Sequence, residues 1–280
     1  MFTGLLRKFI IMKSCHEFLQ TILPELGYRW AGFRKVRRQV CRRIHQRMQE
    51  LGIASYRDYL YYIAQNPGER AILDRSLDIT ITRFWRDKGV YALLEKTVFP
   101  DLIQQVLQEK RTKLRCWSAG CCNGEEPYSL QLLWHIRLSP EDLNLEIIAT
   151  DRNQAVLDRA QRGCFPEGVL KDLPADLLEK GFERKDAAHV IKDQFKHNIH
   201  FLRQDIREEM PGGQFDIILC RNFILTYFDR EISVPLLNKF LSLIRKGGYF
   251  IIGSTETIPP AFDKLKQIKK GEPVYRLYEE

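Results

Sequence analysis

The sequence predicts an α/β fold, a mostly parallel sheet with helices on both faces, preceded by a small all-α N-terminal domain. From about residue 90 onward, short apolar segments alternate with segments of helical spacing, which is typical of a parallel sheet. Before that point strand signals are scarce and helical patterns dominate. We expect an N-terminal helical domain over 1–78, a linker over 79–90 that contributes to the functional site, and a sheet domain over 91–280.

The N-terminal domain carries the whole net charge of the chain. Residues 1–75 contain 14 Lys and Arg against 6 Asp and Glu, a net charge of +8, whereas residues 76–280 contain 30 of each. This asymmetry indicates an acidic partner. We expect Arg34, Arg38 and Arg42 to form one basic face for this partner, because they recur every four residues. Nucleic acid is the less favoured partner, and a solvated helix face is the simplest alternative.

The helices of this domain have recognisable starts and stops. In one expected helix over 33–52, a single apolar stripe supports the helical spacing, and Gly52 ends it; the stripe comprises Val36, Val40, Ile44, Met48 and Leu51. Ser55 is an expected N-cap with Asp58 three residues later, an approximate capping box. Asn66 is the next expected cap, with Pro67 at the first helical position.

The sheet domain contains a clear series of apolar segments. Strands are expected at 114–119, 145–150, 199–203, 215–220 and 248–253, with an antiparallel edge strand at 273–278. Helices are expected between several of them, at 125–137, 153–162 and 229–245. Residues 163–198 fit the alternation poorly, so we expect an insertion there. Its sequence has helical spacing over 165–183 and suggests a short hairpin over 189–201.

The cysteines and the chain ends indicate the compartment. Seven cysteines are scattered without a C-x-x-C motif, so we expect reduced, buried thiols in a cytoplasmic protein. The stretch 1–13 has only short apolar runs interrupted by Arg7 and Lys8, and no signal peptide is expected. No apolar run approaches the roughly 20 residues of a membrane span, so stable membrane insertion is not expected. We expect a monomer.

The segment SAGCCNGEEPYS, residues 118–129, lies between an expected strand and an expected helix. Gly120 and Gly124 allow a sharp turn and close approach to a ligand. The G-x-G-x-x-G fingerprint and the Walker lysine are both absent. Glu125 and Glu126 occupy the helix N-terminus where a phosphate would otherwise bind. Two carboxylates there would repel a pyrophosphate and suit a cationic ligand.

A second acid supports this interpretation. Asp151 follows the next strand, where a carboxylate can accept hydrogen bonds from both ribose hydroxyls of a nucleoside. A nucleoside with positive charge and no phosphate describes S-adenosylmethionine (SAM), although capping and surface charge remain the alternative role of these acids. Cys121 and Cys122 are interpreted as small residues that fill the turn. A metal site would need more ligands than this stretch offers, so no metal is expected.

Four segments carry a resemblance to a known family. GCCNGEEPYS (120–129) resembles the signature G-x-S-x-G-E-E-P-Y-S of the CheR family. ITRFWRD (81–87), FDIILCRN (215–222) with YFD (227–229), and GSTETIP (253–259) resemble other segments of that family, in the same order. The resemblance implies a Rossmann-like methyltransferase that transfers a methyl group from SAM to glutamates of membrane chemotaxis receptors, with S-adenosylhomocysteine (SAH) as the second product.

The resemblance also implies roles for individual residues. Glu126 is expected to hold the methionine ammonium, Arg86 to position the substrate carboxylate, and Tyr227 to flank the methyl-transfer site. The basic helical domain is expected to meet acidic receptor helices. The expected cofactor contacts are Thr80, Thr82, Arg86, Gly120, Glu126, Asp151, Asp205, Ile206, Asn222 and Phe223.

Four departures from the family pattern leave other methyl acceptors open. Thr80 stands where the family has asparagine, and Asp205-Ile206 stands where it has Asn-Leu. One extra residue separates Asn222 from Tyr227, and GSTETIP (253–259) lacks the usual Ser-Glu order. The alternative is a divergent SAM-dependent methyltransferase that acts on another carboxylate, a small molecule or nucleic acid. A third hypothesis is a regulatory module that binds SAM without turnover.

Overall fold

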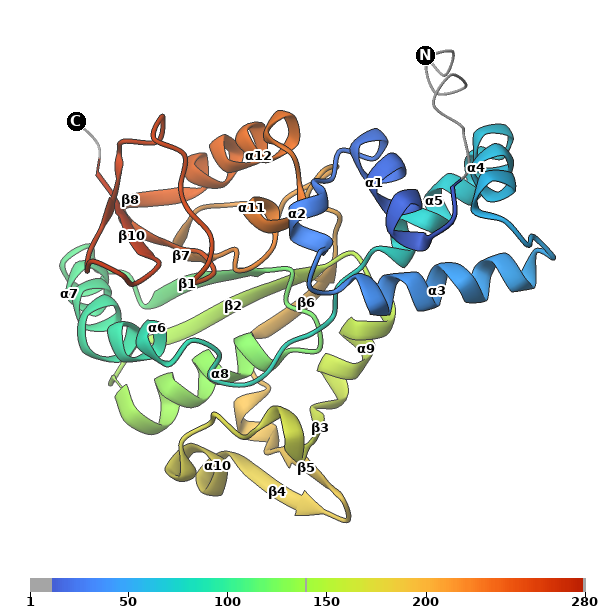
Figure 1. The fold of residues 1–280 in the computed structure, drawn as a ribbon. Helices are drawn as coiled ribbons and strands as arrows, with labels where there is room; N and C mark the ends of the chain where they lie inside the picture. The colour runs from blue at the N-terminus through green and yellow to red at the C-terminus, as the bar shows by residue number, and fades with distance from the viewer. Residues whose placement is uncertain (1–11, 139, 279–280) are drawn as a thin grey trace. The chain divides into compact units, whose positions relative to one another are not determined.

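The computed structural model describes residues 12–138 and 140–278 (Figure 1). The stretch 1–11, which includes most of the segment where no signal peptide is expected, lies outside the described residues. The chain forms two compact units. We call residues 1–79 with 226–233 the helical unit, and residues 80–225 with 234–280 the sheet unit. In neither described range does a helix combine the length and the apolar character that a membrane crossing needs.

The helical unit is built from short helices around an apolar core. Its helices are α1 (Cys15–Glu25), α2 (Trp30–Phe33), α3 (Arg37–Glu50), α4 (Tyr56–Gln65) and α5 (Pro67–Ser76). The predicted stripe of α3 is confirmed at its centre, where Val40, Ile44 and Met48 are buried. Phe18 of α1 stacks on Tyr59 of α4 with ring centroids 5.6 Å apart, which joins α1 and α4 in the same core.

The helix ends follow the predicted chemistry in part. The Ser55 side chain accepts a hydrogen bond from the Asp58 backbone N–H at 3.1 Å, so the predicted cap of α4 is confirmed. Gly52 has φ of +68° just beyond α3, as expected of a residue that ends a helix. Asn66 and Pro67 do begin α5, but the Asn66 amide donates back to the Tyr62 carbonyl and does not cap the helix.

The single helix expected over 33–52 is wrong. Phe33 ends α2 and is buried in a cluster of rings, 5.6 Å from Tyr28 and 5.0 Å from Tyr227 between centroids. The chain then turns over 34–36 before α3 begins at Arg37. Arg34 therefore lies outside the helix that carries Arg38 and Arg42.

The sheet unit confirms the predicted fold class. Its large sheet has the order β6-β2-β1-β7-β8-β10-β9. The first five strands in that order run parallel, whereas β10 is antiparallel to both β8 and β9. The strands are β1 (Lys113–Ala119), β2 (Asn144–Asp151), β6 (Ile199–Arg203), β7 (Phe215–Leu219), β8 (Ile244–Ile251), β9 (Leu265–Gln267) and β10 (Val274–Leu277). All the strands predicted from apolar segments are present, including the antiparallel edge.

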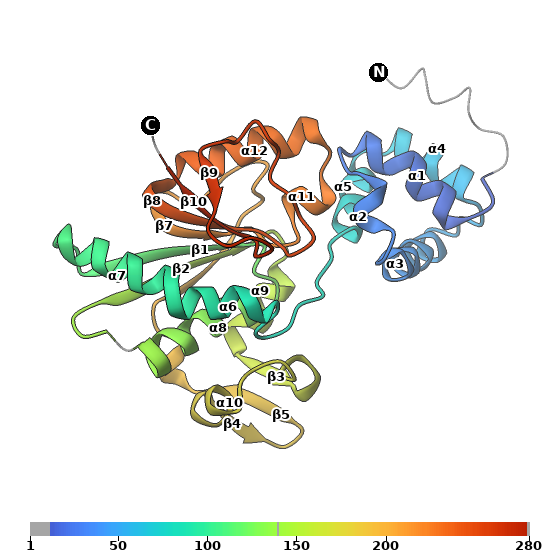
Figure 2. The same ribbon diagram turned by 60° about the vertical axis from the view of Figure 1, so that its left-hand side comes forward.

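Helices cover both faces of this sheet. Figures 1 and 2 show α6, α7 and α8 on one face and the later part of α12 on the other. The helices are α6 (Lys88–Leu93), which continues through a π-helical turn at Leu94–Val98 into α7 (Phe99–Gln108), then α8 (Glu125–Leu133), α9 (Gln154–Arg162), α11 (Ile224–Tyr227) and α12 (Arg230–Ser242). Trp117 of β1 stacks on Phe240 of α12 at 4.5 Å, while the neighbouring Cys116 points into the core of the opposite face.

The insertion is a small antiparallel sheet and not a mainly helical segment. It contains β3 (Cys164–Pro166), α10 (Ala175–Gly181), β4 (Phe182–Lys185) and β5 (Ala188–Ile191), in the strand order β3-β5-β4. The hairpin expected over 189–201 is wrong: β4 and β5 form the hairpin, and residue 201 belongs to β6 of the large sheet. Asp186 has φ of +53° in the two-residue turn, a conformation that tight hairpins require.

The linker that precedes α6 is anchored to this insertion. Phe84 is fully buried, with its ring centroid 4.8 Å from that of Phe165 and 5.3 Å from that of Phe182. Its backbone N–H donates to the Val169 carbonyl at 3.0 Å. Phe84 thus fixes the position of the linker two residues before Arg86.

Candidate active site

The candidate site lies at the carboxyl edge of the large sheet. The central strands β1, β2 and β7 are parallel, so their carboxyl ends meet at one edge. The turn at 120–124 follows β1, Asp151 ends β2, and the segment 221–223 follows β7. Sequence segments far apart in the chain are therefore brought together where open α/β sheets bind ligands.

Arg221 is the centre of this site. Its side chain is only 4% exposed, and its Nη1 donates to Glu126 Oε2 at 3.0 Å. Its Nη2 bonds to Asp87 Oδ2 at 2.8 Å and to the Arg86 carbonyl at 2.5 Å. Burial alone would lower the pKa of Arg221, but the acids Glu126 and Asp87 and the nearby Tyr91 raise it above its ordinary value. One buried guanidinium thus joins the β7 end, the α8 N-terminus and the linker.

Glu126 presents a carboxylate held from two sides. Ser118 Oγ donates to Glu126 Oε1 at 2.6 Å, and Arg221 binds the other oxygen. A carboxylate has about four acceptor positions, so these two bonds leave capacity for a further donor. The arrangement suits an ammonium group, as expected of Glu126.

Asp151 ties the ends of β1 and β2 together. Its Oδ2 accepts the Cys122 backbone N–H at 3.1 Å, and its Oδ1 accepts the Asn153 backbone N–H at 2.9 Å. The Gly120 N–H donates to the Thr150 carbonyl at 2.8 Å. The turn is therefore fixed against β2, with the Asp151 carboxylate beside it.

Asn222 and Phe223 line the same edge from β7. Asn222 Oδ1 is buried and has no hydrogen-bond partner, which is costly for a polar atom unless a ligand completes it. The Phe223 ring lies against Gly120, where a Cβ added to the glycine would come within 3.0 Å of the ring. Gly120, at φ of +73°, is thus needed both for the turn and for this close approach.

Unusual backbone conformations gather at this edge. Among the described residues, eight that are not glycine have positive φ, and four of these belong to the site. Trp85 and Asp87 lie on either side of Arg86, and the other two are Cys122 and Asn222. Such conformations cost energy, persist only where the surroundings hold them, and cluster at functional sites. Here Trp85 stacks on Tyr91 at 4.3 Å, while Arg221 holds Asp87.

The remaining expected cofactor residues lie in the same unit. Arg86 is half-buried, as are Thr80 and Thr82 in the irregular linker. Asp205 is engaged by Arg207 at 2.6 Å and by Arg152 at 3.7 Å. Burial alone would raise the pKa of Asp205, but the hydrogen bonds and charge of Arg207 bring it below its ordinary value.

Ile206 is 3% exposed, so its side chain is almost wholly packed within the sheet unit. Its predicted contact with the cofactor, like that of Asp205 beside it, stays a prediction.

Tyr227 belongs to the helical unit. Its ring packs against Phe33, and its carbonyl accepts the Arg29 N–H at 2.8 Å. Its expected place beside the methyl-transfer site stays a prediction.

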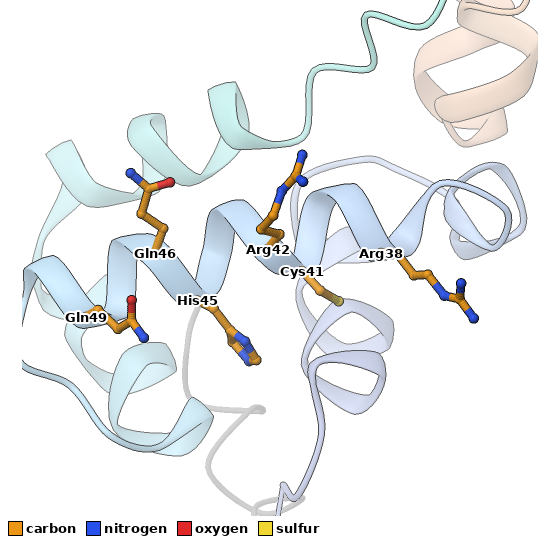
Figure 3. A pocket seen from close by; sticks show the side chains of 6 residues that line it. All are labelled: Arg38, Cys41, Arg42, His45, Gln46 and Gln49. Carbon is orange, nitrogen blue, oxygen red and sulfur yellow. The ribbon is translucent and has the colours of Figure 1, made fainter.

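The arginines of α3 fall into two groups, one exposed and one bound to other residues of the helical unit. Arg38 and Arg42 are exposed and line an open pocket on α3 (Figure 3). Figure 3 shows Arg42 and Gln46 on one side of α3, with Cys41 and His45 on the other. Arg47 instead pairs with Glu69 at 2.7 Å. Arg43 donates to the carbonyls of Ser76 and Asp78.

The expectation of seven reduced, buried thiols is wrong for four cysteines, one of which is the half-buried Cys122. Cys15 and Cys41 form a disulfide with their Cα atoms 5.9 Å apart, because α1 and α3 pack side by side. Cys164 is free but exposed. Cys121, in the site, is buried, and burial raises its pKa well above the ordinary value, so this thiol is neutral and a poor nucleophile. Within residues 12–138 and 140–278, no three His, Cys, Asp or Glu side chains form a potential metal site.

Sequence reasoning missed Arg221 and Glu256. Arg221 is the middle residue of the C-R-N segment, and an arginine between an expected strand end and an expected ligand asparagine was the available signal. Glu256 lies in GSTETIP and accepts three backbone N–H bonds at the site. Neither role could be read from spacing, because the partners are distant in sequence.

The site fits a cationic nucleoside better than a dinucleotide. Its carboxylates include Glu126 and Asp151, and the buried Asn222 Oδ1 has no hydrogen-bond donor. The fold and this set of hydrogen-bond acceptors define an α/β domain suited to a phosphate-free nucleoside cofactor.

Comparison with known proteins identifies the family. Residues 80–273 match the model described as CheR methyltransferase, SAM binding domain, and residues 35–77 match the one described as CheR methyltransferase, all-alpha domain. The chain belongs to the CheR methyltransferase family and is a SAM-dependent methyltransferase, as its motifs predicted.

Several similar proteins are named chemotaxis protein methyltransferase. Chemotaxis protein methyltransferase 2 of Pseudomonas aeruginosa is 30% identical over 239 residues, which cover 83% of this chain and 82% of that protein. Chemotaxis protein methyltransferase of Borreliella burgdorferi is 29% identical over 223 residues, 77% of this chain and 78% of that protein. The protein of that name from Listeria monocytogenes is 34% identical over 182 residues, 65% of this chain and 67% of that protein.

Proposed function

We propose that this protein transfers methyl groups from SAM to glutamate side-chain carboxylates of chemotaxis receptors, forming methyl esters and SAH. The observation that carries this is that Arg221 binds both Glu126 and the backbone carbonyl of Arg86, which joins the proposed cofactor carboxylate to the proposed substrate-binding arginine. The names of the relatives support a chemotaxis role.

One set of residues is proposed to bind the cofactor and another to bind the substrate. Glu126 would bind the ammonium and Asp151 the ribose hydroxyls, while Asn222 and Phe223 would contact the adenosyl group. Thr80, Thr82, Asp205 and Ile206 complete the proposed contacts. When bound, SAM supplies a methyl group whose bond to sulfur breaks as the carboxylate oxygen bonds to the methyl carbon, the electron pair remaining on sulfur.

The substrate needs positioning and no general base. A glutamate carboxylate has a reference pKa of about 4.3 and is ionised at neutral pH. Arg86 can bind it through two parallel hydrogen bonds and aim one oxygen, which is catalysis by orientation. Asp87 and Trp85, in their unusual backbone conformations, hold Arg86 between them. Tyr227 would assist near the transferring methyl group.

The exposed arginines of α3 are the proposed receptor contact. Arg38 and Arg42 lie beside an open pocket and would meet acidic receptor helices, with Arg34 just before the helix. The protein would act in the cytoplasm as a monomer.

Methyl transfer can be tested with methyl-labelled SAM and receptor-containing membranes from the same source. A carboxyl methyl ester is base-labile, so mild base should release volatile labelled methanol. Arg86→Ala should reduce that release at least a hundredfold, because substrate orientation is lost. The matched control Arg162→Ala, at the exposed end of α9, should keep wild-type release.

The outcomes separate the alternatives. Base-stable label would indicate an amine, ribose or base acceptor and would overturn the glutamate proposal. Label on a soluble acid with none on membrane protein would indicate a divergent branch of the family. SAM binding without any transfer would indicate a regulatory module.

A further inference from the structure

Glu256 holds the segment after β7 through its backbone. Glu256 Oε2 accepts the Asn222 N–H at 2.8 Å and the Gly253 N–H at 2.7 Å. Its Oε1 accepts the Phe223 N–H at 3.1 Å. A carboxylate that binds backbone N–H groups forms charge-assisted hydrogen bonds, about twice as strong as neutral ones. Asn222 and Phe223, both proposed to contact the adenosyl group, are therefore bound by one side chain.

The segment needs such a partner because of its conformation. Asn222 has φ of +53°, which an L-residue adopts at a cost. Gly253 comes so close that a Cβ there would clash with Asn222 Nδ2. The closing segment thus supports Asn222 in two ways, by close contact through Gly253 and by hydrogen bonds through Glu256.

The same closing segment reaches the linker. Ser254 Oγ donates to Asp87 Oδ1 at 3.3 Å, and Asp87 is also bound by Arg221. Segment 253–256 therefore contacts Asn222 and Phe223 through Glu256, and Asp87 through Ser254.

We infer that Glu256 is a positioning residue for the cofactor, which acts by fixing the backbone of Asn222 and Phe223. The inference rests on the proposed role of these two residues as cofactor contacts. Without the Glu256 carboxylate, the two N–H groups lose their acceptor, Asn222 can leave its left-handed conformation, and its Oδ1 and the Phe223 ring move off the cofactor. Loss of the Glu256 carboxylate therefore weakens cofactor binding and leaves receptor binding unchanged.

Glu256→Gln is the sharpest variant. One glutamine end is an NH₂ group, which cannot accept, so at least one of the three N–H bonds is lost in either amide orientation. The side-chain volume is unchanged. Glu256→Asp keeps the charge but shortens the reach, and should fall between glutamine and wild type. Glu179→Gln, on the exposed surface of α10, is the matched control.

The test measures the Kd for SAH by calorimetry, with steady-state kinetics on receptor membranes and a melting curve for each variant. Glu256→Gln should raise the Kd for SAH and the KM for SAM tenfold or more, leave the KM for receptor unchanged, and keep a cooperative melting transition. Glu256→Asp should recover part of the affinity. Glu179→Gln should match wild type throughout.

Asn222→Gly distinguishes the inference from its premise, because glycine keeps the backbone conformation and removes the side chain. If Asn222→Gly weakens SAH binding and Glu256→Gln does not, the inference about Glu256 is overturned while the cofactor site stands. If neither variant changes the Kd for SAH, the proposed cofactor contact of Asn222 is overturned, and the inference about Glu256 is overturned with it. If Glu256→Gln does not fold, wild-type affinity in a folded Glu256→Asp would also overturn the inference.

Discussion

Arg221 and Glu126 are joined by a hydrogen bond of 3.0 Å between Nη1 and Oε2, although 95 residues separate them in the chain. This bond links the C-R-N segment after β7 to the G-E-E-P segment at the start of α8. The same guanidinium holds Asp87, so the two sequence signatures and the linker form one network. A substitution that removes Arg221 should therefore disturb Glu126 and Asp87 at the same time.

Arg221→Ala should destabilise the sheet unit and abolish cofactor binding. Removing one partner of a buried charge pair leaves the other without compensation, at a cost of about 3–5 kcal/mol. Urea denaturation should show the loss of unfolding free energy. Arg221→Lys keeps the charge but cannot bind Glu126 and Asp87 together, so it should fold and weaken SAH binding about tenfold, or ~1.4 kcal/mol. Unchanged SAH affinity in the lysine variant would contradict the network.

The two adjacent glutamates should respond differently to the same substitution. Glu126→Gln removes the charge opposite the methionine ammonium, and a charged hydrogen bond contributes about 1.5–3 kcal/mol. The Kd for SAM should rise about 10- to 100-fold. Glu125→Gln should leave the Kd near the wild-type value, because Glu125 is buried and makes no contact assigned to the cofactor. Calorimetry on both variants decides, and equal losses would refute the assignment to Glu126.

Glu125 should make folding stability depend on pH. Burial raises the pKa of Glu125 from 4.5 to about 7. Between these values the unfolded chain has released a proton that the folded protein still binds, so the stabilising contribution is complete below about pH 4.5 and is lost as the pH rises to about 7. The full effect is about 3 kcal/mol. Urea unfolding at pH 5 and pH 8 should show a smaller pH dependence in Glu125→Gln, and an unchanged dependence would contradict this.

The disulfide predicts a thiol count and a stability change. Protein purified without reductant and then denatured should show five reactive thiols, because Cys15 and Cys41 are paired. Cys41→Ser should lower the unfolding free energy of the helical unit by roughly 3 kcal/mol, since the bond closes a loop of 26 residues in the unfolded chain. A count of seven thiols would show that the bond does not form.

Charge reversal on α3 should weaken receptor binding without affecting the cofactor. Arg38→Glu and Arg42→Glu should raise the KM for receptor and reduce its dependence on salt, because the attraction to acidic helices is electrostatic. The control Arg75→Glu makes the same charge change at an exposed position on α5. An equal effect of Arg75→Glu would mean that net charge, and not the α3 face, governs binding.

The sequence was sufficient to predict the large sheet, and it predicted a site at the carboxyl ends of the strands. The central strands β1, β2 and β7 are mostly buried, so their sequences are largely apolar and can be told from the helices between them. Glu126 and Asp151 could be placed at this edge because strand ends in parallel sheets converge, whereas Asn222 was predicted only from the resemblance to the CheR family.

Two of the errors have their origin in long-range packing, and the third lies in a local turn. The disulfide depends on how α1 lies against α3, which no spacing reveals. Arg34 was placed on a helix that in fact breaks where Phe33 joins a ring cluster with Tyr28. The hairpin was misplaced because β4 and β5 are short and half polar, and their pairing depends on the turn at Asp186.

Locating the transferred methyl group is the most direct test of carboxyl methylation by this protein. Receptor from the same source, treated with the protein and SAM, would be digested and its peptides sequenced by mass spectrometry. We expect one added methylene on glutamate side chains, lost after mild base and absent with Arg86→Ala. Methyl groups on any other residue type, or unchanged glutamates despite measured SAH formation, would contradict the proposed function.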